Sequence, residues 1–365
     1  MKFICIKENL EKVLSVAERF IGKNLTLPIL GNILLEHDGI TLKISATNLE
    51  YAFQAEIPGK SGKPGKLCVP AKIFNPLIQS LKDEKIELEE KQMNLIVTAD
   101  ARRVVINGVL AEDFPLIPKI KKISTFAVDS ALLQEALAKV LPAVSSSEFK
   151  PELTGVYLRV SQKEICLAAT DTFRLAEKRI EMDGKLKGDA CTFILPFRIA
   201  QELVRILPQG EDVSVSLGDN QVLFEMRGIK IISRLIEGNF PEYGAIIPKE
   251  FEVSGFFPKS AFVDAVRSSS IFSSKLQDVS FHFYGKGVEI SSANADVGEF
   301  KTTLNASVAG KELAVSFNYR YLLDGLTALH EEEFFFGLNG ENKPSLLRNK
   351  ADGSLLYVLM PIRLM

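Results

Sequence analysis

Asp171 and Arg174 are the side chains whose types and spacing come nearest to a catalytic or ion-pairing arrangement in this sequence. A catalytic site needs a nucleophile, a base and an orienting group within hydrogen-bond reach. No histidine lies near the pair in the sequence, and no such set of groups coincides around it. We therefore interpret Asp171 and Arg174 as a structural ion pair or as part of a peptide-binding rim, and we predict no catalytic residue.

Two other segments resemble ligand-binding motifs. Residues 59–61 read Gly-Lys-Ser, like the end of a phosphate-binding loop, but that loop needs a glycine where this chain has Gln54. The segment is therefore interpreted as a solvated turn. Residues 82–90 are rich in Asp and Glu and resemble a metal site. The alternation of Ile86 and Leu88 with charged residues instead indicates an edge strand with a charged outer face.

Cysteine and histidine, the usual ligands of transition metals, are scarce and scattered. The cysteines sit in separate apolar runs with no Cys-x-x-Cys pair, so we expect reduced, buried thiols. The histidines are far apart in the sequence, with no metal-ligand neighbour at the usual spacing. We expect no metal site and no cofactor. The residues concerned are Cys5, Cys68, Cys166 and Cys191, and His37, His282 and His330.

The composition is that of an ordinary folded protein. The 365 residues are 46% apolar and 25% charged, and 44 basic against 46 acidic side chains leave a formal charge of −2. These values exclude a disordered or collagen-like chain, and the length suits two or three domains. No run approaches the roughly 18–20 apolar residues of a membrane span, and Lys2 precedes any secretory apolar core. We therefore expect a cytoplasmic protein with no membrane partner.

The chain repeats one pattern three times. Residues 44–53, 167–176 and 290–299 are each an apolar run that enters a small polar turn, spaced by 123 positions. A repeat of this kind determines the architecture before any motif inside it is interpreted. A second set of matching segments ends in each case at a helix start, at residues 67–72, 193–198 and 315–320.

Each repeat is predicted to be an α+β domain with two helices beside antiparallel sheets. In the first repeat Leu10, Val13 and Leu14 fall on one helical face, and similar patterns follow in the other repeats. Short alternating runs between the helices indicate strands. Proline and charge mark linkers at residues 118–124 and 247–250. The expected domains are residues 1–122, 123–248 and 249–365.

Lys72, Arg198 and Arg320 occupy matching positions, in the first turn of the second helix of each repeat. A cation there opposes the helix dipole at a cost of about 0.3 kcal/mol or more. One explanation is a basic lining for phosphates, to which Lys259 and Arg267 would add. The alternative is that the three cations are solvated helix ends, and the sequence leaves both interpretations open.

Four segments carry a resemblance to a known family. They lie at residues 26–32 (Thr-Leu-Pro-Ile-Leu-Gly-Asn), 169–176 (Ala-Thr-Asp-Thr-Phe-Arg-Leu-Ala), 238–243 (Gly-Asn-Phe-Pro-Glu-Tyr) and 357–364 (Tyr-Val-Leu-Met-Pro-Ile-Arg-Leu). Together with the three repeats, their order and spacing resemble the bacterial DNA polymerase III beta subunits, the replicative sliding clamps. The resemblance covers the whole chain.

The resemblance implies a clamp fold in which two subunits join head to tail into a ring of six domains around duplex DNA. Such a ring contacts phosphates without reading sequence, and a near-neutral chain suits sliding. It also implies a non-catalytic processivity factor, associated with the nucleoid. Its implied partners are the DNA polymerase III catalytic subunit, the clamp loader, and other polymerases and repair proteins that carry short linear motifs.

The resemblance further implies three sets of site residues. The peptide pocket carries over to Leu153, Thr170, Thr172, Arg174, Leu175, Pro241, Ile246, Leu276, Asn318, Tyr321, Met360, Pro361, Ile362 and Arg363. The DNA-binding set is Lys23, Asn24, Lys72, Lys150, Arg198, Lys259, Arg267 and Arg320. The dimer interface is expected at Arg102, Arg103, Val104, Ile106, Ile271, Phe272, Asp296 and Glu299.

The chain departs from the family pattern at two places. Thr172 and Phe173 stand where the family usually has glycine and a histidine or tyrosine, so we expect a pocket rim of different polarity. Pro151 and Glu152 replace a tyrosine pair used for DNA contact, so that contact does not carry over. The nearest remaining candidates for it are Lys23, Asn24 and Lys150.

A different class of protein is compatible with the same repeats. A monomeric three-domain peptide-binding scaffold without a DNA role would show no ring and no basic inner face. An enzyme is the third alternative, which the lack of a coincident nucleophile, base and orienting group disfavours.

Overall fold

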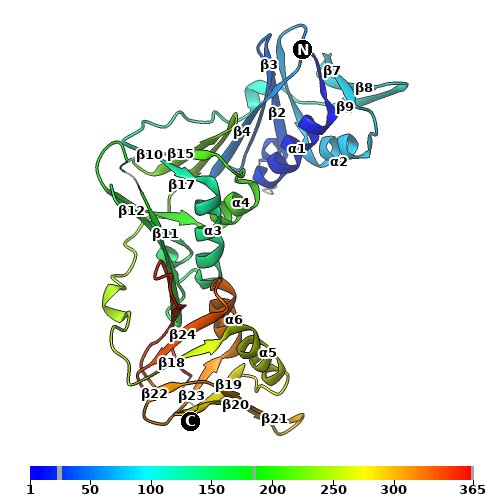
Figure 1. Cartoon of the computed structure of the whole chain (residues 1–365). Coiled ribbons are helices and arrows are strands. Elements are labelled where there is room, and N and C mark those ends of the chain that lie inside the picture. Colours follow the sequence, from blue (N-terminus) through cyan, green and yellow to red (C-terminus); the bar gives the residue numbers. More distant parts are fainter. Residues whose placement is uncertain (23–26, 183, 185, 363–365) are drawn as a thin grey trace. The chain divides into compact units, whose positions relative to one another are not determined.

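The structure, a computed structural model, describes residues 1–22, 27–182, 184 and 186–362. Its elements form two compact units (Figure 1). The first unit comprises Met1–Ser130 and Ile206–Leu235, and the second comprises Ala131–Arg205 and Ile236–Met365. Each unit contains two sheets in which the paired strands run antiparallel, together with packed helices, as expected for the α+β class.

The first unit contains a five-stranded and an eight-stranded sheet beside two helices. The five-stranded sheet has the order β5 (Lys60–Ser61), β1 (Lys2–Ile6), β7 (Lys85–Lys91), β8 (Asn94–Ala99), β9 (Arg102–Asn107). The eight-stranded sheet has the order β10 (Ser124–Asp129), β15 (Asp212–Leu217), β16 (Gln221–Met226), β17 (Ile229–Arg234), β4 (Tyr51–Pro58), β3 (Thr41–Thr47), β2 (Asn32–His37), β6 (Gly65–Pro70). The helices are α1 (Lys7–Ala17) and α2 (Ala71–Ser80), with short 3₁₀ turns at Glu18–Phe20, Pro28–Gly31 and Ala111–Asp113.

The second unit contains a nine-stranded and a four-stranded sheet beside four helices. The nine-stranded sheet has the order β14 (Cys191–Pro196), β11 (Gly155–Val160), β12 (Glu164–Thr170), β13 (Arg174–Glu181), β26 (Leu355–Leu359), β25 (Ser345–Asn349), β24 (Glu333–Leu338), β18 (Val253–Pro258), β22 (Val308–Gly310). The four-stranded sheet has the order β21 (Gly298–Asn305), β20 (Gly287–Asn294), β19 (Asp278–Tyr284), β23 (Leu313–Asn318). The helices are α3 (Ser130–Val140), α4 (Phe197–Ile206), α5 (Lys259–Ser270) and α6 (Tyr319–Ala328), with 3₁₀ turns at Leu141–Ala143, Pro151–Leu153 and Gly244–Ile246.

The helices pack through the apolar faces that the sequence pattern predicts. In α1, Leu10, Leu14 and Ala17 are fully buried. In α5, Phe262 lies among the aromatic rings of the third repeat, stacked on Phe281 with ring centroids 5.8 Å apart. Burying such side chains is the main favourable term in folding, so these apolar faces hold α1 and α5 in place.

The three repeats join through one recurring strand pairing. The strand after the small polar turn of one repeat pairs with the last strand of the next repeat: β4 pairs with β17, and β13 with β26. In equivalent positions, Tyr51 lies opposite Ser233 and Arg174 opposite Leu359. The strands of the second repeat are therefore shared between two large sheets, which is why the compact units divide that repeat.

The acidic segment 82–90 is not an edge strand, contrary to the sequence-based expectation. The alternation is correct, since Ile86 and Leu88 are fully buried, but β7 lies in the middle of its sheet between β1 and β8. Its carboxylates are neutralised across the strands: the ammonium of Lys2 lies 2.9 Å from Glu87, and the N-terminal ammonium 3.1 Å from Glu90. The charged side chains of β7 therefore indicate ion pairs with the neighbouring strand and not an unpaired strand edge.

The Gly-Lys-Ser segment at residues 59–61 is also more ordered than a solvated turn. Lys60 and Ser61 form the short strand β5, which pairs with Ile4 and Phe3 of β1. A Cβ atom on Gly59 would collide with the carbonyl oxygen of Ile4 and the ring of Phe3. Close packing therefore accounts for this glycine.

Candidate functional site

An apolar cavity of about 450 Å³ opens in the second unit where β12, β13 and β26 meet a connecting segment. The strands contribute the ends nearest the small polar turn at residues 171–173. The connecting segment contributes Pro241, Tyr243 and Ile246. The full lining is Lys150, Leu153, Thr170, Thr172, Phe173, Arg174, Leu175, Pro241, Glu242, Tyr243, Ile246, Pro344, Val358 and Met360.

Hydrogen bonds within the turn set the shape of the cavity rim. The Thr170 hydroxyl donates to the carbonyl of Arg174 at 2.6 Å and accepts from the amide of Thr172 at 3.1 Å. Asp171 Oδ1 accepts from the amides of Phe173 and Arg174, both at 3.0 Å. Thr172 has a φ of 78°, in the left-handed region that a β-branched residue seldom adopts. The turn therefore displays the Phe173 ring, which is 59% exposed, at the rim.

Arg174 forms one wall of the cavity and joins β13 to α6. Its Nε donates to Asp171 at 3.0 Å, and its Nη1 donates to Asp324 and, at 3.4 Å, to the Tyr357 hydroxyl. The guanidinium lies 4.1 Å from the centroid of the Tyr321 ring. Burial opposes its charge, but its neighbours, first Tyr357 and then the carboxylates, outweigh burial and raise the pKa of Arg174. The predicted Asp171–Arg174 ion pair is confirmed, and it belongs to a larger network.

Eight of the predicted pocket residues line this cavity: Leu153, Thr170, Thr172, Arg174, Leu175, Pro241, Ile246 and Met360. Of the other predicted residues, Tyr321 contacts Arg174, whereas Asn318 caps α6 by accepting from the amides of Arg320 and Tyr321. Leu276 is exposed on a loop, Pro361 follows Met360, and Ile362 lines a different cavity. Arg363 lies outside the described residues.

Sequence reasoning missed several lining residues or gave them another role. The family resemblance assigns Lys150 to DNA contact and marks Phe173 only as a departure. Glu242, Tyr243 and Val358 belong to the motif segments without being assigned to the pocket, and Pro344 is not named. Val358 could have been predicted from the sequence. It follows Tyr357 on the final strand, and successive side chains of a strand point to opposite faces of the sheet. The position of Tyr243 depends on how the connecting segment folds back, which no local pattern specifies.

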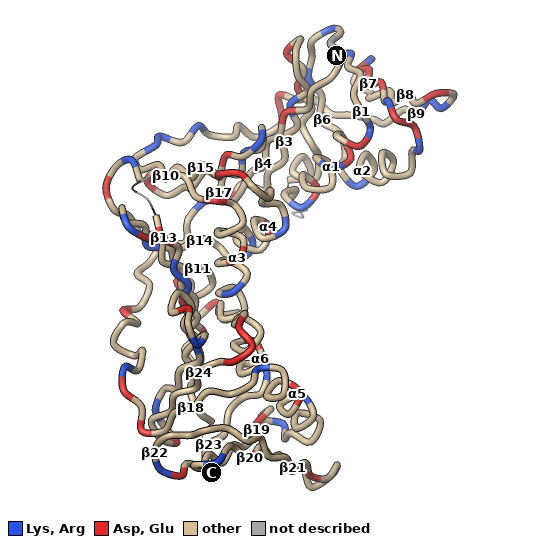
Figure 2. The backbone as a smooth tube through the Cα atoms, in the orientation of Figure 1, with Lys and Arg blue, Asp and Glu red and all other residues tan. Residues whose placement is uncertain are grey.

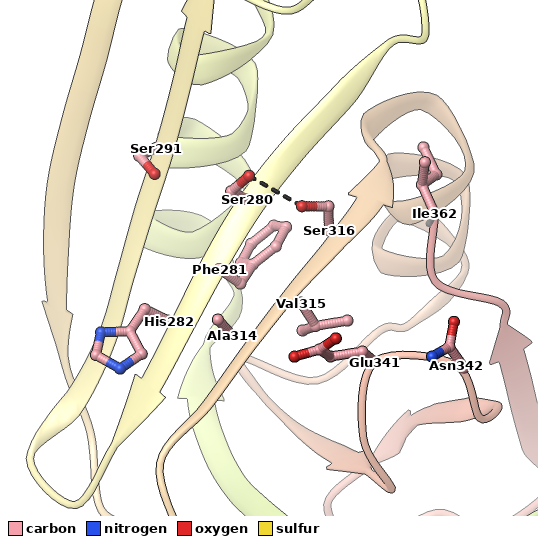
Figure 3. Close-up of a pocket in the computed structure, with 10 residues that line it drawn as sticks. All are labelled: Ser280, Phe281, His282, Ser291, Ala314, Val315, Ser316, Glu341, Asn342 and Ile362. Atoms are coloured by element: carbon pink, nitrogen blue, oxygen red, sulfur yellow. Dashed lines mark hydrogen bonds between the residues drawn. The ribbon is translucent and has the colours of Figure 1, made fainter. Parts of the chain in front are cut away.

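A second cavity of about 540 Å³ lies beside β19, β20 and β23, and its lining mixes polar and apolar side chains (Figure 3). The hydroxyls of Ser280 and Ser316 are 2.9 Å apart there. The amide of Ile362 donates to the carbonyl of Ser316 at 2.8 Å, so the chain passes this cavity after leaving the apolar one. Glu341 and Asn342 contribute further polar groups from a loop.

The predicted DNA-binding cations are exposed at the helix starts. Lys72, Arg198 and Arg320 are each the second residue of α2, α4 and α6, and all three are exposed. Arg198 pairs with Glu202 at 3.2 Å. Figure 2 shows basic and acidic residues interleaved along each unit.

The other predicted cations differ in their surroundings. Lys259 begins α5 and donates to the carbonyl of Leu329 at 2.6 Å, whereas Arg267 is exposed near the end of the same helix. Lys150 lines the apolar cavity instead of standing apart from it. Lys23 and Asn24 lie outside the described residues.

The predicted interface residues lie at two sheet ends, on β9 and near β21. Val104 is half-buried, Ile106 is buried in the first unit and Val105, which was not named, is 52% exposed. In the second unit Ile271 is 69% exposed, and Phe272 stacks on Phe300 with centroids 6.3 Å apart. Among the charged members, Arg102, Arg103, Asp296 and Glu299 are exposed, and Arg102 lies 3.6 Å from Asp83.

The described residues offer little for metal or thiol chemistry. Within them no group of three or more His, Cys, Asp and Glu side chains is arranged to hold a metal ion. Burial raises the pKa of Cys5 and of Cys68 to about 12 and that of Cys166 to about 11, so these thiols stay protonated near neutral pH. In the described part of the chain, no helix is both long and apolar enough to span a membrane.

Comparison with known proteins places all three repeats in one family. Residues 1–118, 127–242 and 244–363 match the N-terminal, central and C-terminal domains of the DNA polymerase III beta subunit. The beta sliding clamp of Synechocystis sp. is 30% identical over the full length of both chains, and that of Bacillus subtilis is 26% identical, also over both full lengths.

Solved structures show the same fold. The chain superposes on the crystal structure of the DNA polymerase sliding clamp from Bacillus subtilis with a TM-score of 0.94 at 25% identity, covering all of both chains. A sliding clamp from Pseudomonas aeruginosa bound to griselimycin gives a TM-score of 0.95 at 25% identity, again covering both chains fully. The expected three-domain clamp fold is therefore confirmed.

Proposed function

The chain belongs to the DNA polymerase III beta subunit family, and on that premise we propose that it is a sliding clamp that encircles duplex DNA and holds the replicative polymerase there for processive synthesis. Two copies form the ring, each with domains at residues 1–122, 123–248 and 249–365. The clamp loader and other polymerases and repair proteins dock through the apolar cavity. The chain itself performs no catalysis.

The strand pairing between repeats is the observation that carries this proposal. Twice within the chain, the strand after the small polar turn pairs with the last strand of the next repeat. The third repeat offers β21 for this pairing and the first repeat offers β9, and both are terminal strands of their sheets. Pairing of β21 with β9 of a second copy, and the reverse, closes six repeats into a ring.

The side chains beside these two strands suit such a junction. Arg102 and Arg103 on β9 are opposite in charge to Asp296 and Glu299 near β21. Ile271 and Val105 are exposed apolar side chains that an interface would bury. We propose these residues, with Val104, Ile106 and Phe272, as the dimer interface.

Contact with DNA is proposed for the exposed cations at the helix starts. Lys72, Arg198 and Arg320 recur at one structural position, where each cation opposes the helix dipole, and a phosphate-facing role would account for that recurrence. Lys23, Asn24, Lys150, Lys259 and Arg267 complete the proposed set. Such contacts position DNA without specifying its sequence.

Docking of linear peptide motifs is proposed for the apolar cavity. Its size and mostly apolar lining, with a few fixed polar groups such as Arg174, are typical of ligand-binding sites. The griselimycin complex of the Pseudomonas aeruginosa clamp shows that a relative of this fold binds that ligand. The proposed pocket residues are those lining the cavity, together with Leu276, Asn318, Tyr321, Pro361, Ile362 and Arg363.

Light scattering over a dilution series tests the ring. The wild-type chain is expected at twice the chain mass, and the double variant Ile271→Ala with Phe272→Ala at the mass of one chain. Ile40→Ala, at a side chain 74% exposed in the first unit, is the matched control and should stay dimeric. A wild-type monomer at all concentrations would favour the peptide-binding scaffold without a DNA role.

A further inference from the structure

A strap of residues 240–249 packs against one face of the sheet formed by β11, β12 and β13 in the second unit, and Figure 1 shows this segment running beside β11 and β12. The ring of Phe240 stacks on Tyr157 at 4.8 Å between centroids, with 11° between the planes. The Tyr243 hydroxyl lies 3.4 Å from the thiol sulfur of Cys166, and burial raises the pKa of Tyr243, so this hydroxyl stays neutral. These two aromatic anchors fix the strap to the sheet.

The strap has a cavity on each side. The apolar cavity described above lies toward the end of β13 that carries Leu175, and a polar cavity of about 400 Å³ lies toward Arg179 on the same strand. Pro241, Glu242 and Tyr243 line both. These three residues therefore form the wall between the two cavities.

The polar cavity is built around a buried carboxylate. Glu177 is only 2% exposed, and its Oε1 accepts from Nε of Arg179 at 2.9 Å and lies 2.8 Å from Nη2. Removing a carboxylate from water is tolerated only when a cation and hydrogen bonds compensate it. The pair therefore holds the guanidinium of Arg179, itself about half exposed, in a fixed position in the cavity wall.

The remaining charges favour an anion. Arg159 and Lys249 line the cavity with exposed side chains, and a guanidinium beside an ammonium suits a carboxylate. The opposing groups are Glu242, which is exposed on the shared wall, and Glu164, which lies 3.5 Å from Arg159. With Glu177 neutralised by Arg179, the lining itself has two further cations against one carboxylate, Glu242. Glu164, outside the lining, offsets part of the charge of Arg159.

We propose that the polar cavity extends the peptide site and receives an acidic side chain that flanks the apolar motif of a partner. The inference rests on the proposed docking function of the apolar cavity. A segment bound in the apolar cavity reaches Arg159 and Lys249 by crossing the wall at residues 241–243. The polar cavity thus selects among apolar motifs by their flanking charge.

Fluorescence polarisation with three labelled peptides tests this. The first peptide has a leucine–phenylalanine core between neutral residues. The other two have the same core with an acidic pair, placed at the N-terminal end in one and at the C-terminal end in the other. The wild-type protein is expected to bind one acidic peptide about threefold to tenfold more tightly than the neutral one, as for two solvent-accessible ion pairs. Raising the salt concentration should reduce this preference.

The double variant Arg159→Gln with Lys249→Gln is expected to lose the preference while keeping the affinity for the neutral peptide, because neither residue lines the apolar cavity. Lys286→Gln, an exposed lysine lining neither cavity, is the matched control and should keep the preference. Equal wild-type affinities for all peptides, or a preference that survives in the double variant, would overturn the extension alone. No binding of the neutral peptide would overturn the docking function and the extension with it.

Discussion

The first and second units contain the same small polar turn, but only one of them opens a large cavity beside it. Thr47 Oγ1 donates to the carbonyl of Tyr51 at 2.9 Å and accepts from the amide of Leu49 at 3.0 Å, as Thr170 does in the second unit. Leu49 has a φ of 79°, close to the 78° of Thr172. The cavity beside the first turn, however, measures about 60 Å³ against about 450 Å³.

The difference lies in side chains at equivalent positions. Where the second unit has Arg174 tied back to α6, the first has Tyr51, whose ring meets Phe20 at 5.6 Å between centroids. Ile117 packs on the buried cluster of Ala52, Leu223 and Ile232 in the first unit. The backbone repeat thus supplies the frame of a site in both units, and the side chains decide whether that frame becomes a pocket.

Removing the guanidinium that holds the pocket wall should have the largest effect. Arg174→Ala leaves Asp171 and Asp324 without their cation, and is expected to lower the free energy of unfolding by about 3 kcal/mol. Peptide affinity should fall at least tenfold with it. Urea unfolding and fluorescence polarisation measure the two effects.

Tyr51→Phe is the control at the equivalent position of the first unit, because it keeps the ring contact with Phe20. It should leave both quantities within experimental error of wild type. An Arg174→Ala protein as stable as wild type would mean that the network around the guanidinium contributes nothing.

Enlarging the cavity of the first unit should cost stability without creating a binding site. Ile117→Ala removes a partly buried side chain from the cluster and is expected to lower the free energy of unfolding by about 1–2 kcal/mol. Peptide affinity should stay unchanged, since the pocket of the second unit is intact. If the variant gained a second peptide site by calorimetry, side-chain filling alone would account for the difference between the units.

Replacing Met360 of the second unit by arginine, the residue at the equivalent position of the first unit, should impair the pocket. Met360 follows β26 as Arg234 ends β17, and each backbone amide donates to the equivalent carbonyl, of Phe173 and of Glu50, at 2.9 Å. Met360→Arg is expected to weaken peptide binding about tenfold, or about 1.4 kcal/mol, by placing a charge in the apolar lining. Arg234→Met is the reciprocal control and should leave binding unaltered. Undiminished affinity in Met360→Arg would show that the peptide does not contact this residue.

Relieving the backbone strain at the two turns should have the smallest effect. A non-glycine residue in the left-handed region costs about 1–3 kcal/mol, which the greater entropy loss of glycine partly offsets. Thr172→Gly and Leu49→Gly are each expected to raise the free energy of unfolding by about 0.5–1 kcal/mol, measured by urea titration. Opposite signs at the two turns would contradict the claim that their backbones are equivalent.

The spacing of the three sequence repeats predicted most of the fold, because each repeat has apolar residues at the same helical and strand positions. It failed where the answer depends on neighbours far away in the chain. The charged residues around Ile86 and Leu88 resemble an edge, yet β7 pairs with β1 and β8 on its two sides, and Lys2 and the N-terminal ammonium neutralise its carboxylates there. Likewise Ile106 faces inward and Val105 outward. The alternation of a strand places the two side chains on opposite faces, but it does not specify which face is buried.

The site was predicted in part for the same reason. Eight lining residues could be named from the family resemblance, and most of them lie at the turn of residues 170–175 or directly after β26, where the sequence motifs stand. Tyr243 and the polar cavity behind it depend on the packing of the strap against Tyr157 and Cys166. No periodic pattern encodes that contact, because a connecting segment buries side chains irregularly.

Retention on DNA tests the central claim most directly. The protein is loaded by its clamp loader onto a nicked circular plasmid, separated from free protein by gel filtration, and the plasmid is then cut once. A ring that encircles DNA should stay on the circle, leave the linear molecule within minutes, and remain if the ends are blocked by bound protein. Equal retention on circular and linear DNA, or none on either, would contradict the account.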